Sequence, residues 1–213
     1  MKKFLLVFFV AMLAGCMQNT TNVGKSQVDR SQLMLVSSDE INEASAKAYS
    51  DVIAQAKASN TLNKDPKLTK RVRDISNKLI AKAPYFREDS AKWNWEVNVI
   101  TSDTINAWCM AGGKIAVYTA IVEKLKLNDD EIAFILAHEI AHALREHVRE
   151  QQSQELVKNG LISVASMFGV DNTILGVANA AANVGISLPF SRSHESESDE
   201  IGLELSYMAG YNP

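Results

Sequence analysis

The feature that constrains this chain most is a short motif on a strongly apolar helix. Residues 128–144 predict that helix, because Asn128 is a good N-cap, Glu131 completes a capping box and apolar residues occupy most of the circumference. The segment contains an H-E-x-x-H motif at residues 138–142. Residues four apart lie one turn apart on the same helix face, so both imidazoles can reach one ion. We therefore expect a metal centre on a helix that runs through the middle of a domain.

The residue types in this motif indicate zinc chemistry. Imidazole nitrogens bind zinc at about 2.0–2.1 Å, and a hydrolytic zinc site keeps one position open for water. We predict that His138 and His142 are two of the ligands and that one zinc ion binds per chain. Glu139 lies about 100° around the helix, beside the ion, where it can act as general base. A purely structural zinc site has no use for this carboxylate, so the motif favours catalysis.

A second polar segment, residues 191–199, supplies candidates for the third ligand. The metzincin pattern is excluded, because it requires a histidine six residues after the second histidine of the motif and Val148 stands there. Glu195 and Asp199 are four residues apart and share a helix face, whereas Glu197 points about 200° away. We therefore favour Glu195 over Glu197 as the third zinc ligand. Asp199 is predicted to lie behind the metal and to fix the tautomer of a ligating imidazole.

The two remaining histidines are left out of the predicted ligand set. In a continuous helix His147 lies about 500° beyond His142 and therefore off the metal face. His194 lies within the second segment, next to Glu195, and is also left out of the ligand set. Both histidines are interpreted as structural or solvent-exposed.

The N-terminus predicts export and lipid attachment. Two lysines precede an apolar run, residues 4–13, which is too short to span a bilayer and is typical of a signal peptide. The L-A-G-C sequence that ends at Cys16 resembles a lipobox, so residues 1–15 are expected to be removed and Cys16 to be lipidated. Met17 is not the aspartate that resembles an inner-membrane retention signal. The expected location is the bacterial outer membrane, facing the periplasm.

The rest of the chain divides into a tether and one domain. Residues 16–36 are polar and predict a flexible tether, and residues 37–213 predict the folded domain. Helical periodicity in the first part of the domain gives way to alternation at residues 93–99 and a second β-rich run at 114–118. The pattern predicts a mostly helical α+β fold with a small sheet beside the metal-binding helix. Residues 160–190 are interpreted as a buried or membrane-facing helical hairpin.

Together the two metal motifs resemble a known family. H-E-I-A-H followed, after a long helical insert, by S-R-x-x-E-x-x-x-D is similar to the HtpX-like and CAAX-prenyl-protease-like zinc metallopeptidases, and the lipobox to their small periplasmic lipoprotein members. The similarity covers about residues 35–213. It implies a gluzincin-type zincin fold in which His138, His142 and Glu195 bind zinc and Glu139 is the base. It also implies that an extended substrate pairs with an edge strand formed by Ile115, Ala116, Val117 and Tyr118.

The function implied by this resemblance is a membrane-anchored, zinc-dependent endopeptidase. Its substrates would be unfolded or misassembled cell-envelope proteins. The alternative is a zinc-stabilised, chaperone-like module that binds outer-membrane proteins with little or no proteolysis, and Glu139 argues against it. With 25 acidic and 22 basic residues, the chain shows no sign of nucleic-acid binding.

The C-terminal residues 209–213 resemble a junction that leads into further helices. In the family, a basic or histidine residue beyond this point is implicated in stabilising the oxyanion. Neither histidine nor arginine follows His194 here. We expect this 213-residue form to bind zinc yet to cleave poorly, and a longer form to be more active.

Overall fold

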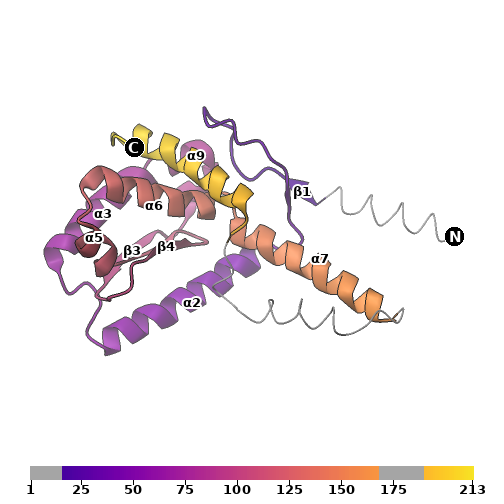
Figure 1. Cartoon of the computed structure of the whole chain (residues 1–213), viewed down its shortest axis with the longest axis horizontal. Helices are drawn as coiled ribbons and strands as arrows, with labels where there is room; N and C mark the ends of the chain where they lie inside the picture. The colour runs from indigo at the N-terminus through magenta and orange to yellow at the C-terminus, as the bar shows by residue number, and fades with distance from the viewer. Residues whose placement is uncertain (1–15, 168–189) are drawn as a thin grey trace.

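The computed structural model describes residues 16–167 and 190–213 (Figure 1). The predicted signal peptide, residues 1–15, and most of the predicted helical hairpin, residues 160–190, lie outside the described residues. Over the described ranges, no helix is both long and apolar enough to cross a membrane. In chain order the elements are β1 (Met17–Gln18), β2 (Gln32–Leu33), α2 (Ser38–Ala58), α3 (Pro66–Ile80), α4 (Ala83–Phe86), the 3-10 helix η1 (Glu88–Lys92), β3 (Glu96–Ile100), β4 (Ala107–Met110), β5 (Lys114–Tyr118), α5 (Thr119–Leu125), α6 (Asp129–Leu144), α7 (His147–Met167) and α9 (Arg192–Met208).

Local sequence signals start the helices. Asn128 and Glu131 form the reciprocal capping box predicted for α6. Asp65 caps α3 and is followed by Pro66, whose missing N–H is not needed in the first helical turn. The predicted mostly helical α+β fold with a small sheet is confirmed.

The small sheet has the strand order β3-β5-β4, with β3 parallel and β4 antiparallel to β5. The strand predicted to lie at the edge, Ile115 to Tyr118, is therefore the central strand, and that prediction is wrong. Its apolar run is explained by pairing on both sides and by burial on both faces, since the first four residues of β5 are buried. Gly112 and Gly113, both with positive φ, turn the chain between β4 and β5. The true edges of this sheet are β3 and β4.

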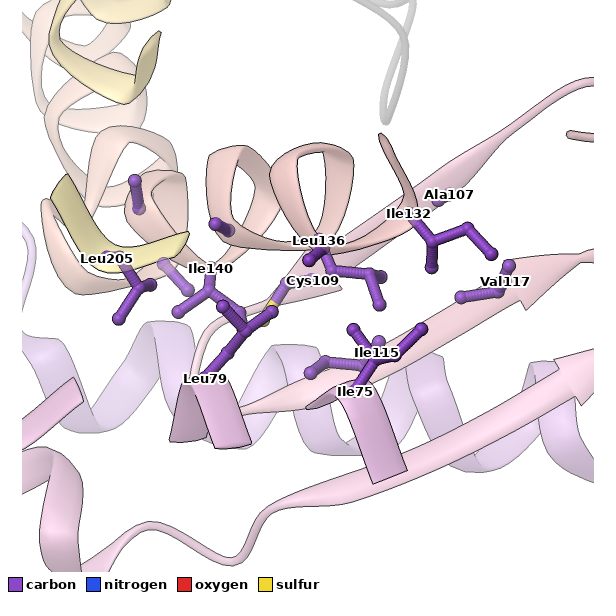
Figure 2. Packing of buried hydrophobic residues seen from close by; sticks show 14 of the residues in the cluster. Ile75, Leu79, Ala107, Cys109, Ile115, Val117, Ile132, Leu136, Ile140 and Leu205 are labelled. Atoms are coloured by element: carbon purple, nitrogen blue, oxygen red, sulfur yellow. The ribbon is translucent and has the colours of Figure 1, made fainter. Parts of the chain in front are cut away.

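The main core lies between α6, α3 and one face of the sheet (Figure 2). Ile132, Leu136 and Ile140 of α6 are at most 2% exposed and point toward the sheet and α3. Their partners include Cys109 on β4 and Ile115 on β5. The other face of the sheet packs against α2 in a smaller cluster. The expectation that the motif-bearing helix runs through the middle of the domain is confirmed.

Helix α9 packs directly against α6 on the side away from the sheet (Figure 1). Gly202 makes this approach possible, because a Cβ atom there would lie 2.9 Å from the backbone nitrogen of His138. The contact carries the polar segment at the start of α9 to the H-E-x-x-H motif, although about fifty residues separate the two in sequence.

Residues 16–36, here called the N-terminal strap, are not a free tether. They form the β1–β2 pair and lie against the domain, with Gln32 fully buried. The side chains of Thr20 and Gln32 both donate hydrogen bonds to the carbonyl oxygen of Arg145. The predicted flexible tether is therefore wrong for this segment, because several of its polar residues form hydrogen bonds to the domain.

Candidate metal centre

Three predicted ligand atoms converge between α6 and α9. The Nε2 atoms of His138 and His142 lie 3.0 Å apart. The carboxylate oxygens of Glu195 lie 3.5 Å from His138 Nε2 and 3.7 Å from His142 Nε2. His142 is buried, whereas the Glu195 side chain is about half exposed, so the centre opens toward solvent on the α9 side.

These separations fit a zinc ion. Tetrahedral ligands at about 2.0–2.1 Å from zinc lie about 3.3 Å from one another, which is within the range of the three distances above. Two imidazoles and one carboxylate are also a known donor set of hydrolytic zinc sites, and they leave a fourth position for water. In neutral form both histidines can offer a lone pair, and burial lowers the pKa of His142 to about 2.

Glu139 lies next to this donor set without belonging to it. Burial, with a smaller contribution from the charge of Glu195, raises the pKa of Glu139 to about 7. The charge of Glu139 also acts on the buried thiol of Cys109, whose pKa is raised mainly by burial. The charge of Glu139 is therefore felt both by Glu195 of the metal centre and by Cys109 of the edge strand β4. A carboxylate with such a pKa is suited to take up and release a proton near neutral pH.

Asp199 lies behind His138, as its helix-face position predicts. Its Oδ1 atom is 2.9 Å from Nδ1 of His138. An ionised carboxylate only accepts hydrogen bonds, so this contact keeps a proton on Nδ1 and leaves Nε2 free to face the centre.

The segment that carries the metal centre is similar in sequence to known proteins. Residues 66–213 match the sequence model of peptidase family M48. The chain belongs to that family. The resemblance predicted from the two metal motifs is confirmed, and the matched range contains every residue of the centre described above.

Relatives in this family are named as proteases. Mitochondrial metalloendopeptidase OMA1 of Arabidopsis thaliana is 35% identical over 120 residues, which are 56% of this chain and 24% of the relative. The beta-barrel assembly-enhancing protease of Yersinia pestis is 29% identical over 175 residues, 76% of this chain and 34% of the relative. Its Escherichia coli K12 counterpart is 26% identical over the same shares. The chain thus spans about a quarter to a third of the length of these curated relatives.

Sequence reasoning missed that His147 of this M48 chain contacts His142, a predicted zinc ligand. Its Nδ1 atom lies 2.9 Å from Nδ1 of His142, and its Nε2 atom lies 3.1 Å from Glu197. The helical-wheel angle does not apply, because α6 ends at Leu144, Glu146 adopts a left-handed conformation with φ of 51°, and α7 begins at His147. His147 is thus fully buried beside a predicted ligand rather than pointing elsewhere.

His194 is buried and structural, one of the two interpretations given for it. Its Nε2 atom lies 3.1 Å from Glu150, and its ring stacks on that of His147 at 4.4 Å between centroids. Phe190 stacks on the ring of His142, with 4.2 Å between the ring centroids. The clustering of all four histidines in two sequence segments was the only signal that could have indicated this arrangement.

Proposed function

We propose that this M48 protein is a zinc-dependent endopeptidase that hydrolyses internal peptide bonds of unfolded or misassembled cell-envelope proteins. The observation that carries the proposal is the convergence of His138, His142 and Glu195 beside the partly buried carboxylate of Glu139. A binding module would need the three ligands but not a carboxylate with a pKa near neutrality next to them.

In the proposed reaction Glu139 moves the proton. Zinc held by His138, His142 and Glu195 would lower the pKa of a water and polarise the peptide carbonyl. Glu139 removes a proton from the attacking water and returns it to the leaving nitrogen. Asp199 keeps the ring of His138 in place during these steps.

Substrate binding is proposed for the outer edge of β4 instead of β5. Strand β4 is an edge strand, packs against α6, which carries Glu139, and contributes Cys109, whose thiol is affected by the charge of Glu139. An extended peptide that adds to this edge would form main-chain hydrogen bonds and would bring a peptide bond to the centre. Such pairing selects unfolded or flexible chains more than a particular sequence.

The proposed location is the bacterial outer membrane, facing the periplasm, with the chain attached through lipidated Cys16. The lipobox sequence supports the attachment, and two relatives are beta-barrel assembly-enhancing proteases of bacteria. Cys16→Ser should remove the acceptor for the lipid, so the protein should leave the membrane fraction or stay unprocessed. Fractionation of cells that make either form checks this. Association of the mutant with the outer membrane that resists high salt would contradict the lipid anchor.

The endopeptidase proposal is tested with the zinc-loaded protein and one unfolded substrate protein. Internal cleavage should occur, should stop when a chelator is added, and should return when zinc is restored. Stable binding of the substrate without any cleavage at full zinc occupancy would instead support the alternative, a chaperone-like binding module.

A further inference from the structure

A chain of hydrogen bonds runs from His142 into the protein. It passes from Nδ1 of His142 to Nδ1 of His147 at 2.9 Å and from Nε2 of His147 to Glu197 at 3.1 Å. These three residues are here called the relay. The hydroxyl of Ser198 lies 3.4 Å from the same Nδ1 atom of His147.

The acceptor at the end of the relay fixes the direction of every bond in it. An ionised carboxylate can only accept, so Nε2 of His147 must carry the hydrogen and donate to Glu197. A neutral imidazole carries one hydrogen, so Nδ1 of His147 is bare and accepts from Nδ1 of His142. The remaining nitrogen of His142, Nε2, then has a free lone pair and faces His138 and Glu195.

Two arginines hold the carboxylate at the end of the relay. Arg145, whose side chain is fully buried, places Nε 2.9 Å and Nη2 2.8 Å from Glu197. Arg30 donates from Nε to Glu197 and, from its two Nη atoms, to both oxygens of Glu150 at 2.5 and 2.8 Å. Arg30 therefore joins α9 to α7: it is the second arginine paired with Glu197 and is also paired with Glu150.

Arg30 belongs to the N-terminal strap and lies outside residues 66–213, the range that matches the family. The strap also surrounds Arg145, which donates from Nη2 to the carbonyl oxygen of Arg30 at 3.0 Å and from Nη1 to Asn19 at 2.6 Å. Gln32 adds a third donor to Glu150 at 2.8 Å. The strap thus completes the charge pairing on which the relay depends.

We propose that the N-terminal strap is part of the metal centre, with Arg30 as a positioning residue that acts through Glu197 and His147 to hold Nε2 of His142 toward the ion. This inference rests on the proposed zinc site. It means that the segment next to the predicted lipid attachment must be docked on the domain for full metal affinity.

Zinc affinity, measured by competition with a chromophoric chelator, tests the role of Arg30. Loss of a partner behind a metal ligand commonly weakens metal binding by about 10–100-fold. Arg30→Gln should weaken zinc binding by about tenfold or more. The matched control is Arg73→Gln, because Arg73 also donates to backbone and side-chain acceptors but lies on α3, away from the centre. Arg73→Gln should leave zinc affinity unchanged.

A double-mutant cycle separates positioning from general loss of structure. His147→Phe keeps a ring to stack on His194 but removes both nitrogens of the relay. If Arg30 acts through His147, the double variant should bind zinc no more weakly than His147→Phe alone. Additive losses would overturn the inference, and so would an Arg30→Gln protein with the zinc affinity of the wild type. Arg30→Lys should weaken zinc binding less than Arg30→Gln does, because lysine keeps the positive charge but lacks the forked donors of the guanidinium group.

The tautomers of the wild-type histidines provide a test that needs no variant. Long-range ¹⁵N–¹H correlation spectra of the zinc-free protein at neutral pH should show hydrogen on Nδ1 of His142 and on Nε2 of His147. The opposite pair of tautomers would overturn the relay. If the wild type binds no zinc under any of these conditions, the proposed function fails. If it binds zinc and Arg30→Gln binds equally well, only the strap inference fails.

Discussion

At the residue scale, metal binding and proton transfer are assigned to different side chains. Glu139 lies outside the set of three converging donor atoms, so Glu139→Gln should keep zinc affinity within about twofold of the wild type. The amide cannot take a proton from water, and removal of a general base commonly costs about 10²–10⁴ in rate. We therefore expect kcat on an unfolded substrate to fall by at least about 100-fold at equal zinc occupancy.

The control for this variant is Glu123→Gln on α5, which removes one exposed carboxylate away from the centre. It should cleave at the wild-type rate. Wild-type cleavage by Glu139→Gln would show that another group acts as the base, whereas loss of zinc from that variant would show that Glu139 is itself a ligand.

The spacing of residues was enough to predict which side chains meet at the centre, but not what lies behind them. The predicted site residues lie within regular helices, where angles around the axis follow from residue numbers. These are His138 and His142 on α6 and Glu195 and Asp199 on α9. His147 lies beyond a helix end with a left-handed residue, where those angles no longer hold.

At the element scale, the close packing of α6 and α9 depends on Gly202. In Gly202→Ala the new methyl group would meet the backbone of His138 at 2.9–3.0 Å, and backbone cannot rotate away as a side chain can. One helix must shift, and Glu195 on α9 shifts with it. Overpacking of this kind costs about 1–3 kcal/mol of stability. We expect a lower unfolding midpoint in denaturant together with weaker zinc binding.

Gly160→Ala is the matched control, because it is also a glycine-to-alanine substitution within a helix. Gly160 lies on α7 with no atom within 4 Å of the position of its Cβ. Alanine there should raise stability by roughly 0.5–1 kcal/mol, because it lowers the conformational entropy of the unfolded chain. If Gly202→Ala and Gly160→Ala had the same stability and the same zinc affinity, the contact at Gly202 would not determine where α9 lies.

Strand order was beyond what the sequence could decide. The sequence indicated β-rich segments at residues 93–99 and 114–118, which overlap β3 and β5 of the three-stranded sheet. The apolar run of β5 is compatible with any buried strand, so its composition alone does not show whether the strand is central or lies at an edge. Pairing is decided by tertiary contacts: β3 comes alongside β5 as a parallel neighbour, and β4 folds back on its other side.

At the scale of the whole molecule, the main error concerned the N-terminal strap. Its polar composition fits a solvated linker and a docked segment equally well, since composition does not reveal where the partners of polar groups lie. The partners are far along the chain: Glu150 and Glu197 for Arg30, and backbone amides of Lys25 and Ser26 for Glu204. Such bonds exist only after α7 and α9 have assembled.

The same network should make the folded protein sensitive to acid. Burial opposes ionisation of Glu150, but hydrogen bonds from Arg30, His194 and Gln32 outweigh it and hold its pKa below the usual 4.5; Glu197 behaves likewise, with a pKa of about 2. A folded-state pKa below the unfolded value gives stability that is present above about pH 4.5 and is lost as pH falls toward the folded-state value.

Zinc-free wild type should therefore lose stability steeply below pH 4.5, by up to about 1.4 kcal/mol per pH unit for each of the two carboxylates. Arg30→Gln removes a cation from both, so its stability should depend less on pH in that window while being lower than the wild type at pH 7. Arg73→Gln should keep the wild-type slope. Denaturant unfolding at pH 7, 4.5 and 3.5 measures these differences. Equal slopes for wild type and Arg30→Gln would show that the strap does not stabilise the ionised carboxylates.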